Sequence, residues 1–143
     1  MNLCQSLHLA LPEVILAAST LLLIVIGAYG RGKASGLVSG LSVVALVAAA
    51  VAAMFAPFGT TFAGGFVSDA ASTYAKTAIY LMSAFAVFLG HGWLGRLSAR
   101  QFEYPILILL AAVGMGMMVS AGDLIALYVG VELQSLALYV LAA

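Results

Sequence analysis

The residue best placed for chemistry is a single acid inside an apolar stretch late in the chain. Glu132 stands within AGDLIALYVGVELQSLALYVLAA, ten of whose residues are Leu, Ile or Val. It follows Asp123 by nine residues, so a helix would carry it about 13 Å along its axis at 1.5 Å per residue. That depth is near the midplane of a bilayer whose hydrocarbon core is about 30 Å thick. An acid at this depth is a candidate for a proton relay.

The apolar residues around Glu132 allow such a helix to insert. A central charge costs about 2.5–3.5 kcal/mol, and each Leu, Ile or Val returns about 0.3–0.6 kcal/mol. Burial favours the neutral form of a carboxyl and a nearby lysine favours the charged form. An acid whose partner moves can therefore gain or lose a proton, as a charge switch requires. The alternative is a permanently protonated acid that only hydrogen-bonds a neighbouring helix.

A polar stripe accompanies this acid. Tyr128, Ser135 and Tyr139 stand at i−4, i+3 and i+7 from Glu132, so all four share one face of a helix. Such a stripe must face protein or water rather than lipid. Since no lysine or arginine lies in the middle of an apolar stretch, we expect the basic partner of Glu132 to come from another chain or from residues outside this sequence.

Other ionisable residues have simpler expected roles. Asp123 is predicted to cap the helix that carries Glu132, with a place in a proton path as the alternative. Lys76 stands just inside the start of another apolar stretch. We expect it to snorkel to the lipid headgroups, with a relay in the middle of the chain as the alternative. Glu13 suits the positive end of the first helix.

The composition predicts an all-α, polytopic transmembrane helix bundle forming a single domain. The 143 residues are 65% hydrophobic and 7% charged, whereas soluble domains carry about a quarter charged residues. Five stretches are long enough to cross a bilayer. They cover about 11–29, 36–55, 74–93, 105–120 and 124–142. In the fourth, the glycines of VGMGMMVSAG predict close approach of another helix.

The positions of the basic residues predict the orientation. The connections after the first and third stretches carry Arg31, Lys33, Arg96 and Arg100, while the segment before the first stretch carries no lysine or arginine. Positive loops stay in the cytoplasm, so the N-terminus is expected outside. Trp93 and Tyr104 would belong to an aromatic belt on the cytoplasmic side. His91, Arg96 and Arg100 are expected to contact headgroups or water, and Glu103 to begin the fourth helix.

Several site classes are absent from the sequence pattern. The net charge of zero gives no reason to expect nucleic acid as a partner. Cys4 is the only cysteine, which excludes an intrachain disulfide, and His8 and His91 do not form a ligand cluster. The glycines of GRGKASG lack the strand–helix context of a phosphate loop. We expect no metal, no cofactor and no redox centre in this chain.

The stretch DLIALYVGVELQSLALYVLAA resembles the fifth transmembrane helix of the antiporter-like subunits of proton-pumping NADH:quinone oxidoreductase, or respiratory complex I. GVELQSLALYVLAA is most similar to the branch called subunit N, as is LPEVILA near the start. The spacing of Asp69 and Lys76 also resembles that family, although Ala, Ser and Thr replace its usual aromatic residues there. The resemblance covers all 143 residues but only about the first third of the family's length of about fourteen spans, so we expect a longer chain.

The resemblance implies a non-redox membrane-arm subunit that takes part in proton translocation coupled to electron transfer to quinone. Family members pair the fifth-helix acid with a lysine on a later helix, which would be the missing partner of Glu132. FMN and iron–sulfur clusters would lie in other subunits of the hetero-oligomer. The expected location is the bacterial inner membrane, or the mitochondrial inner membrane in a eukaryote. The alternatives are an Mrp-type cation/proton antiporter subunit and a structural membrane scaffold.

Overall fold

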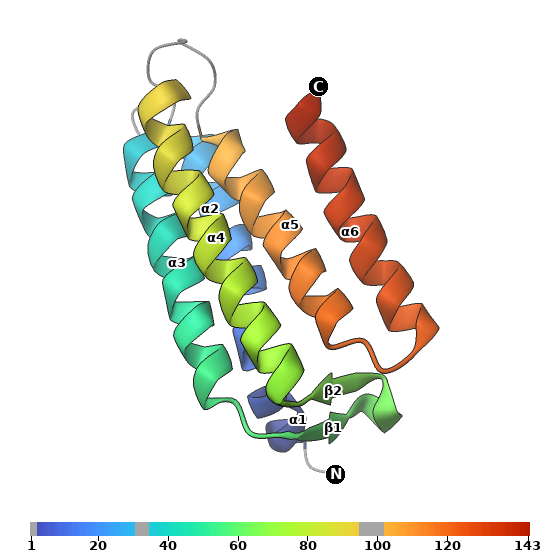
Figure 1. Ribbon diagram of the computed structural model, residues 1–143. Helices are drawn as coiled ribbons and strands as arrows, with labels where there is room; N and C mark the ends of the chain where they lie inside the picture. The colour runs from blue at the N-terminus through green and yellow to red at the C-terminus, as the bar shows by residue number, and fades with distance from the viewer. Residues whose placement is uncertain (1–2, 31–34, 95–101) are drawn as a thin grey trace.

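Five long helices lie side by side and form the body of the molecule (Figure 1). The computed structural model describes residues 3–30, 35–94 and 102–143. A short helix α1 and a two-stranded hairpin close one end of the bundle. The elements are α1 (Leu3–Leu9), α2 (Leu11–Tyr29), α3 (Ser35–Phe55), β1 (Gly59–Thr61), the 3₁₀ turn η1 (Phe62–Gly64), β2 (Phe66–Ser68), α4 (Ala70–Leu94), α5 (Glu103–Val119) and α6 (Leu124–Ala142).

The long helices occupy the five apolar stretches named from the sequence. α2, α3, α4 and α6 are long and apolar enough to cross a membrane, while α5 is a shorter apolar helix of 17 residues. That length is at the lower limit for a transmembrane helix. The all-α, polytopic architecture is therefore confirmed. α4 begins at Ala70, four residues before the predicted start at 74, because Asp69 caps it with Ser72.

The packed core lies among α2, α3, α4 and α5. Leu16, Leu46, Tyr80 and Leu109 come from these four helices in turn, and none of them is exposed. α6 packs against α5, with Gly130 and Ala137 as its buried residues. A side chain at Gly114 of α5 would meet the backbone of α6 at Gln134, so the predicted close approach at this glycine-containing segment is confirmed. Leu133 and Leu141 of α6 are partly buried against the core, and most of the other residues of this helix are exposed.

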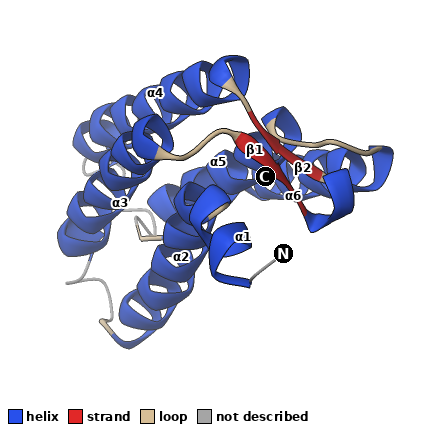
Figure 2. Cartoon of the chain, turned by 90° about the horizontal axis from the view of Figure 1, so that it is seen from below, coloured by secondary structure: helices blue, strands red, loops and turns tan. Residues whose placement is uncertain are grey.

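The hairpin lies between the second and third apolar stretches, where the sequence predicted no regular element. β1 and β2 pair antiparallel, with Thr60 opposite Val67. Phe62 and Ala63 turn the chain with φ of 53° and 54°, a left-handed conformation that costs an L-residue roughly 1–2 kcal/mol. Figure 2 looks at this end and shows the strands crossing it beside α1.

Two main-chain hydrogen bonds tie the hairpin to the turn between α5 and α6. The Val67 N–H donates to the Ser120 carbonyl at 2.8 Å, and the Gly122 N–H donates to the Gly65 carbonyl at 2.9 Å. The hairpin is thus fixed to the start of the helix that carries Glu132. Arg31, Lys33, Arg96 and Arg100 lie outside the described residues.

Candidate functional site

The structure brings together two buried charges from helices far apart in the sequence. Lys76 Nζ of α4 lies 2.6 Å from Glu13 Oε1 of α2, and their side chains are 3% and 8% exposed. Glu13 is in the first turn of α2, whose start is set by Pro12. Lys76 is the seventh residue of α4, about 9 Å along that helix at 1.5 Å per residue. The pair therefore lies inside the bundle, toward the end that carries the hairpin.

Aromatic residues and a glycine enclose this ion pair. The Tyr80 hydroxyl donates to Glu13 Oε1 at 3.4 Å, and Lys76 Nζ lies 4.6 Å from the centre of the Phe66 ring, a distance at which a cation attracts the face of a ring. A side chain on Gly116 of α5 would meet the Tyr80 hydroxyl and approach Glu13 Oε1. Within the described part of the chain, Glu13 Oε2 is buried without a hydrogen-bond partner.

The expectation that Lys76 snorkels to the headgroups is wrong. Lys76 is buried because Glu13 offers a carboxylate across the helix interface. The sequence contained one usable signal for this ion pair. Glu13 and Lys76 each stand near the start of an apolar helix, and both starts lie on the same side of the predicted bundle. The sequence contained no sign that these two helices are neighbours.

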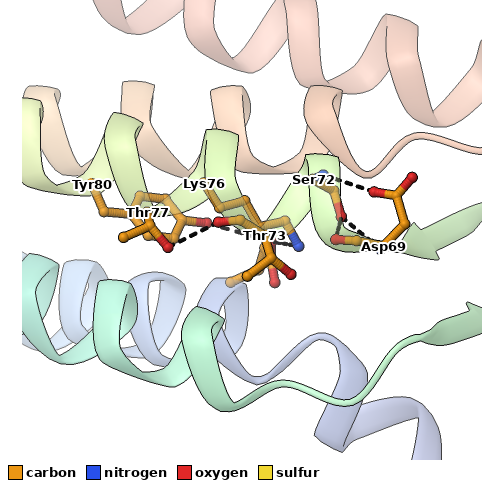
Figure 3. A network of polar contacts seen from close by, with 7 residues as sticks. Asp69, Ser72, Thr73, Lys76, Thr77 and Tyr80 are labelled. Carbon is orange, nitrogen blue, oxygen red and sulfur yellow. Dashed lines mark hydrogen bonds and ion pairs between the residues drawn. The ribbon is translucent and has the colours of Figure 1, made fainter.

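Asp69 does not pair with Lys76 but caps α4. Its Oδ1 accepts from the Ser72 N–H at 2.7 Å, and its own N–H donates to Ser72 Oγ at 2.8 Å. These hydrogen bonds, above all that from the Ser72 N–H, hold the pKa of the Asp69 carboxyl below its ordinary value of 3.8. Figure 3 shows Asp69 and Ser72 at the start of α4, with Lys76 and Tyr80 further along it. The spacing from Asp69 to Lys76 thus marks a capped helix that carries a buried cation.

Glu132 lies on the uncovered face of α6, together with its polar stripe. Glu132 is exposed, Tyr128 and Tyr139 are 64% and 71% exposed, and Ser135 is half-buried. Tyr128 stands one helical turn before Glu132, and its hydroxyl interacts with the Glu132 carboxylate. In the described ranges the ion pair is that of Glu13 with Lys76, and Glu132 has no basic partner.

The other residues named from the sequence belong neither to the Glu13–Lys76 pair nor to the stripe around Glu132. Asp123 caps α6 as expected, with Oδ1 accepting from the Ala126 N–H at 2.7 Å. His91 and Trp93 are exposed near the end of α4, and Glu103 is exposed in the first turn of α5. Tyr104 donates to the Ala86 carbonyl at 3.2 Å. Among the described residues, no group of three or more His, Cys, Asp or Glu could hold a metal ion.

The arrangement offers two acids in opposite settings. Glu13 is enclosed with a counter-ion, whereas Glu132 has a phenol beside it and an open face toward whatever covers α6. Neither arrangement is a nucleophile–base pair or a redox centre.

No protein-family model matches the chain. Curated relatives match it closely over nearly its whole length. It is 46% identical to the NADH-quinone oxidoreductase subunit N of Erythrobacter litoralis, over 100% of this chain and 31% of the relative. The subunits N of Rhizorhabdus wittichii and Rhodospirillum rubrum are 45% and 46% identical over 100% and 97% of this chain, and 30% of each relative is covered.

The chain thus spans about 30% of the length of these relatives. The resemblance stated from GVELQSLALYVLAA is confirmed by these identities, which extend over the whole of this chain. The chain is a homologue of NADH-quinone oxidoreductase subunit N over the part of that subunit that it covers.

Proposed function

We propose that this chain is part of a membrane-arm subunit of NADH–quinone oxidoreductase, and that Glu132 takes part in proton translocation there. The observation that carries the proposal is the identity of 42–46% to proteins named subunit N across the chain. Electron transfer would occur in other subunits, where FMN and iron–sulfur clusters are expected. This chain contributes helices and ionisable side chains.

The exposed face of α6 supports a role for Glu132 at a contact with further protein. An acid, two tyrosines and a serine form a stripe that lipid cannot solvate. About 70% of each relative's length lies outside the region matched by this chain, which is ample protein to cover the stripe. A lysine from such a covering helix would be the partner that Glu132 lacks here.

In the proposed mechanism, Glu132 gains or loses a proton, or its contact with a lysine, when charge shifts along the membrane arm. This change alters the pKa of the next basic group, and a proton then moves to or from that group. Moving one charge against 100 mV costs about 2.3 kcal/mol. One pKa unit corresponds to about 1.36 kcal/mol. Each step must therefore change the pKa of the group that carries the proton by about one to two units. Tyr128, which lies against the carboxylate, would help to hold it in place.

The substitution Glu132→Gln tests this proposal in the complete enzyme complex in sealed vesicles. We expect normal assembly, a lower ratio of protons pumped to electrons transferred, and little effect from the matched change Glu103→Gln. Glu103 is the exposed acid in the first turn of α5. An unchanged ratio in Glu132→Gln would remove Glu132 from the proton path.

Two alternatives are distinguished by different observations. An Mrp-type antiporter subunit would exchange cations for protons without an electron donor, and the names of the relatives favour the oxidoreductase. Copurification of the full subunit with flavin-containing and iron–sulfur subunits separates these two. A structural scaffold would keep Glu132 protonated, so its carboxyl infrared band would not change with pH.

We also propose an inner-membrane location with the N-terminus outside. α1, the hairpin and the turn between α5 and α6 would then lie on the outer side, and α6 would end on the inner side (Figure 1). The lysines and arginines in the sequence between α2 and α3 and between α4 and α5 support this orientation.

A further inference from the structure

We propose that Glu13 and Lys76 form a second proton-exchange site, which water reaches from the hairpin end of the bundle. The proposal does not depend on the role of Glu132, because it rests on different residues at a different place.

A cavity of about 370 Å³ leads from the surface to Glu13. Ala10 and Glu13 are its buried residues, while Phe62, Asp123 and Ile125 are exposed and form its mouth. Its other lining residues are Gly65, Phe66, Met117 and Ala126. The cavity therefore connects a buried carboxylate with an exposed one.

The cavity is mostly apolar, but it is large enough for water and has two carboxylates in its lining. One water molecule needs roughly 10–15 Å³ of space for its centre, so the cavity has room for several water molecules. Waters also need polar partners, and the cavity has a carboxylate at each end, Glu13 inside and Asp123 at the mouth. Both are acceptors, which matches the donor hydrogens of water or of a hydronium ion.

Glu13 has an oxygen left for such a donor. Oε1 accepts from both Lys76 and Tyr80, whereas Oε2 is buried with no hydrogen-bond partner among the described residues. An unsatisfied buried acceptor costs about 1–3 kcal/mol. A water molecule in the adjoining cavity removes that cost.

Proton exchange at this site transfers a single proton between a hydronium ion and the Glu13 carboxylate. A hydronium ion in the cavity gives one proton to Oε2, which leaves water and a neutral acid, and Lys76 keeps its charge. The titratable groups facing Glu13 are Lys76 and Tyr80 on α4 and Asp123 at the start of α6. α5 and the hairpin present Gly116 and Phe66 there, neither of which titrates. The proton therefore alternates between the cavity and Glu13.

Thiol labelling of the full subunit in its assembled complex tests access to the cavity. Ala126→Cys places a thiol on this cavity. Ala86→Cys places one on a cavity of about 550 Å³ whose lining carries no charged side chain. Both alanines are half-buried, and Cys4 and any other reactive cysteine are replaced first.

A charged, membrane-impermeant methanethiosulfonate is then added to each side in turn. We expect Ala126→Cys to react from the hairpin side alone and Ala86→Cys to stay unlabelled. If Ala126→Cys stays unlabelled from the hairpin side, the cavity is dry or covered and the proposal fails. If both variants react alike from that side, access is not particular to the cavity at Glu13, and the proposal also fails.

Infrared spectroscopy of the same complex tests the proton. Without its counter-ion a buried carboxylate is neutralised by a proton, so Lys76→Met is expected to show a new protonated-carboxyl band at neutral pH. The band should shift rapidly in D₂O and be missing from Glu13→Gln/Lys76→Met. A band that does not shift in D₂O would show a sealed structural brace, and a missing band would show that Glu13 takes up no proton there; either result would overturn the proposal.

The labelling experiment leaves the ion pair intact, so it decides the question even where Lys76→Met fails to assemble. A negative result in either experiment leaves the pumping test of Glu132 unaffected.

Discussion

Glu13 and Lys76 are charges that neither helix could bury alone. The two side chains meet 2.6 Å apart with little exposure, and each compensates the desolvation of the other. Removing one partner leaves an uncompensated buried charge, which costs about 3–5 kcal/mol, whereas replacing both can be close to neutral.

A double-mutant cycle measures this coupling. We expect Glu13→Gln and Lys76→Met each to lower the free energy of unfolding of the full subunit in detergent by about 3–5 kcal/mol. The double variant should lose much less than the sum of the two. Strictly additive losses would show that the two charges do not stabilise each other.

Gly116 makes room for the Tyr80 hydroxyl beside Glu13. An added methyl group at Gly116 would meet that hydroxyl, so Gly116→Ala must displace Tyr80 from the carboxylate. Overpacking of this kind costs about 1–3 kcal/mol. The matched control is Gly40→Ala in α3, where no other atom lies within 4 Å, and we expect it to be neutral or slightly stabilising. Equal thermal stability of the two variants would contradict the packing described here.

At the scale of elements, aspartates begin two of the long helices. Asp69 and Ser72 cap each other's backbone at the start of α4, and Asp123 caps α6. These caps set how far each helix reaches toward the hairpin, and therefore how deep Lys76 and Glu132 lie.

The Asp69 cap predicts a dependence of stability on pH. Its pKa is lowered below 3.8 in the folded chain, so the unfolded chain binds more protons as the pH falls. The stabilisation is complete above that value and is lost as the pH falls through the lower, folded pKa. Asp69→Asn should cap without titrating, so thermal unfolding of this variant should change less between neutral and acidic pH. Identical pH profiles would rule out Asp69 as a source of the effect.

The Asp123 cap is testable without changing pH. Asp123→Ala should lower the free energy of unfolding by about 1 kcal/mol, because it leaves the first N–H groups of α6 without a side-chain acceptor. Asp123→Ser should retain most of that stability. Equal losses in both variants would mean that the cap contributes little.

The sequence predicted the long helices well, since each is a continuous apolar stretch bounded by glycine, proline or a charge. The hairpin was missed because GTTFAGGFVS has no alternation of apolar and polar residues over a useful length. Phe62 and Ala63 also take a positive φ that favours glycine. α1 was missed because seven residues are too few to show a helical period.

At the scale of the whole molecule, the two acids differ in how far the sequence could place them. The depth of Glu132 follows from its position within one helix, and its stripe follows from helical spacing. The pairing of Glu13 with Lys76 depends on how α2 and α4 pack, across 63 positions of sequence. Helix neighbours are set by side-chain fit around Leu16 and Tyr80 in the core, which no local pattern shows.

The bundle is also one-sided. α2, α3, α4 and α5 enclose a core, while α6 turns a polar stripe outward. A polar stripe facing lipid would be unstable, so in the membrane it must face further protein or water. The relatives, about three times as long, are consistent with such a cover. We propose that Glu132 acts against such a protein cover as a proton switch.

The most direct measurement is the ratio of protons pumped to electrons transferred by the assembled complex in sealed vesicles, with Glu132→Gln beside Glu103→Gln. We expect a clear fall in the ratio for Glu132→Gln at normal assembly, and the unmodified ratio for Glu103→Gln. The unmodified ratio in Glu132→Gln, or an equal fall in both variants, would contradict the proposed role of Glu132.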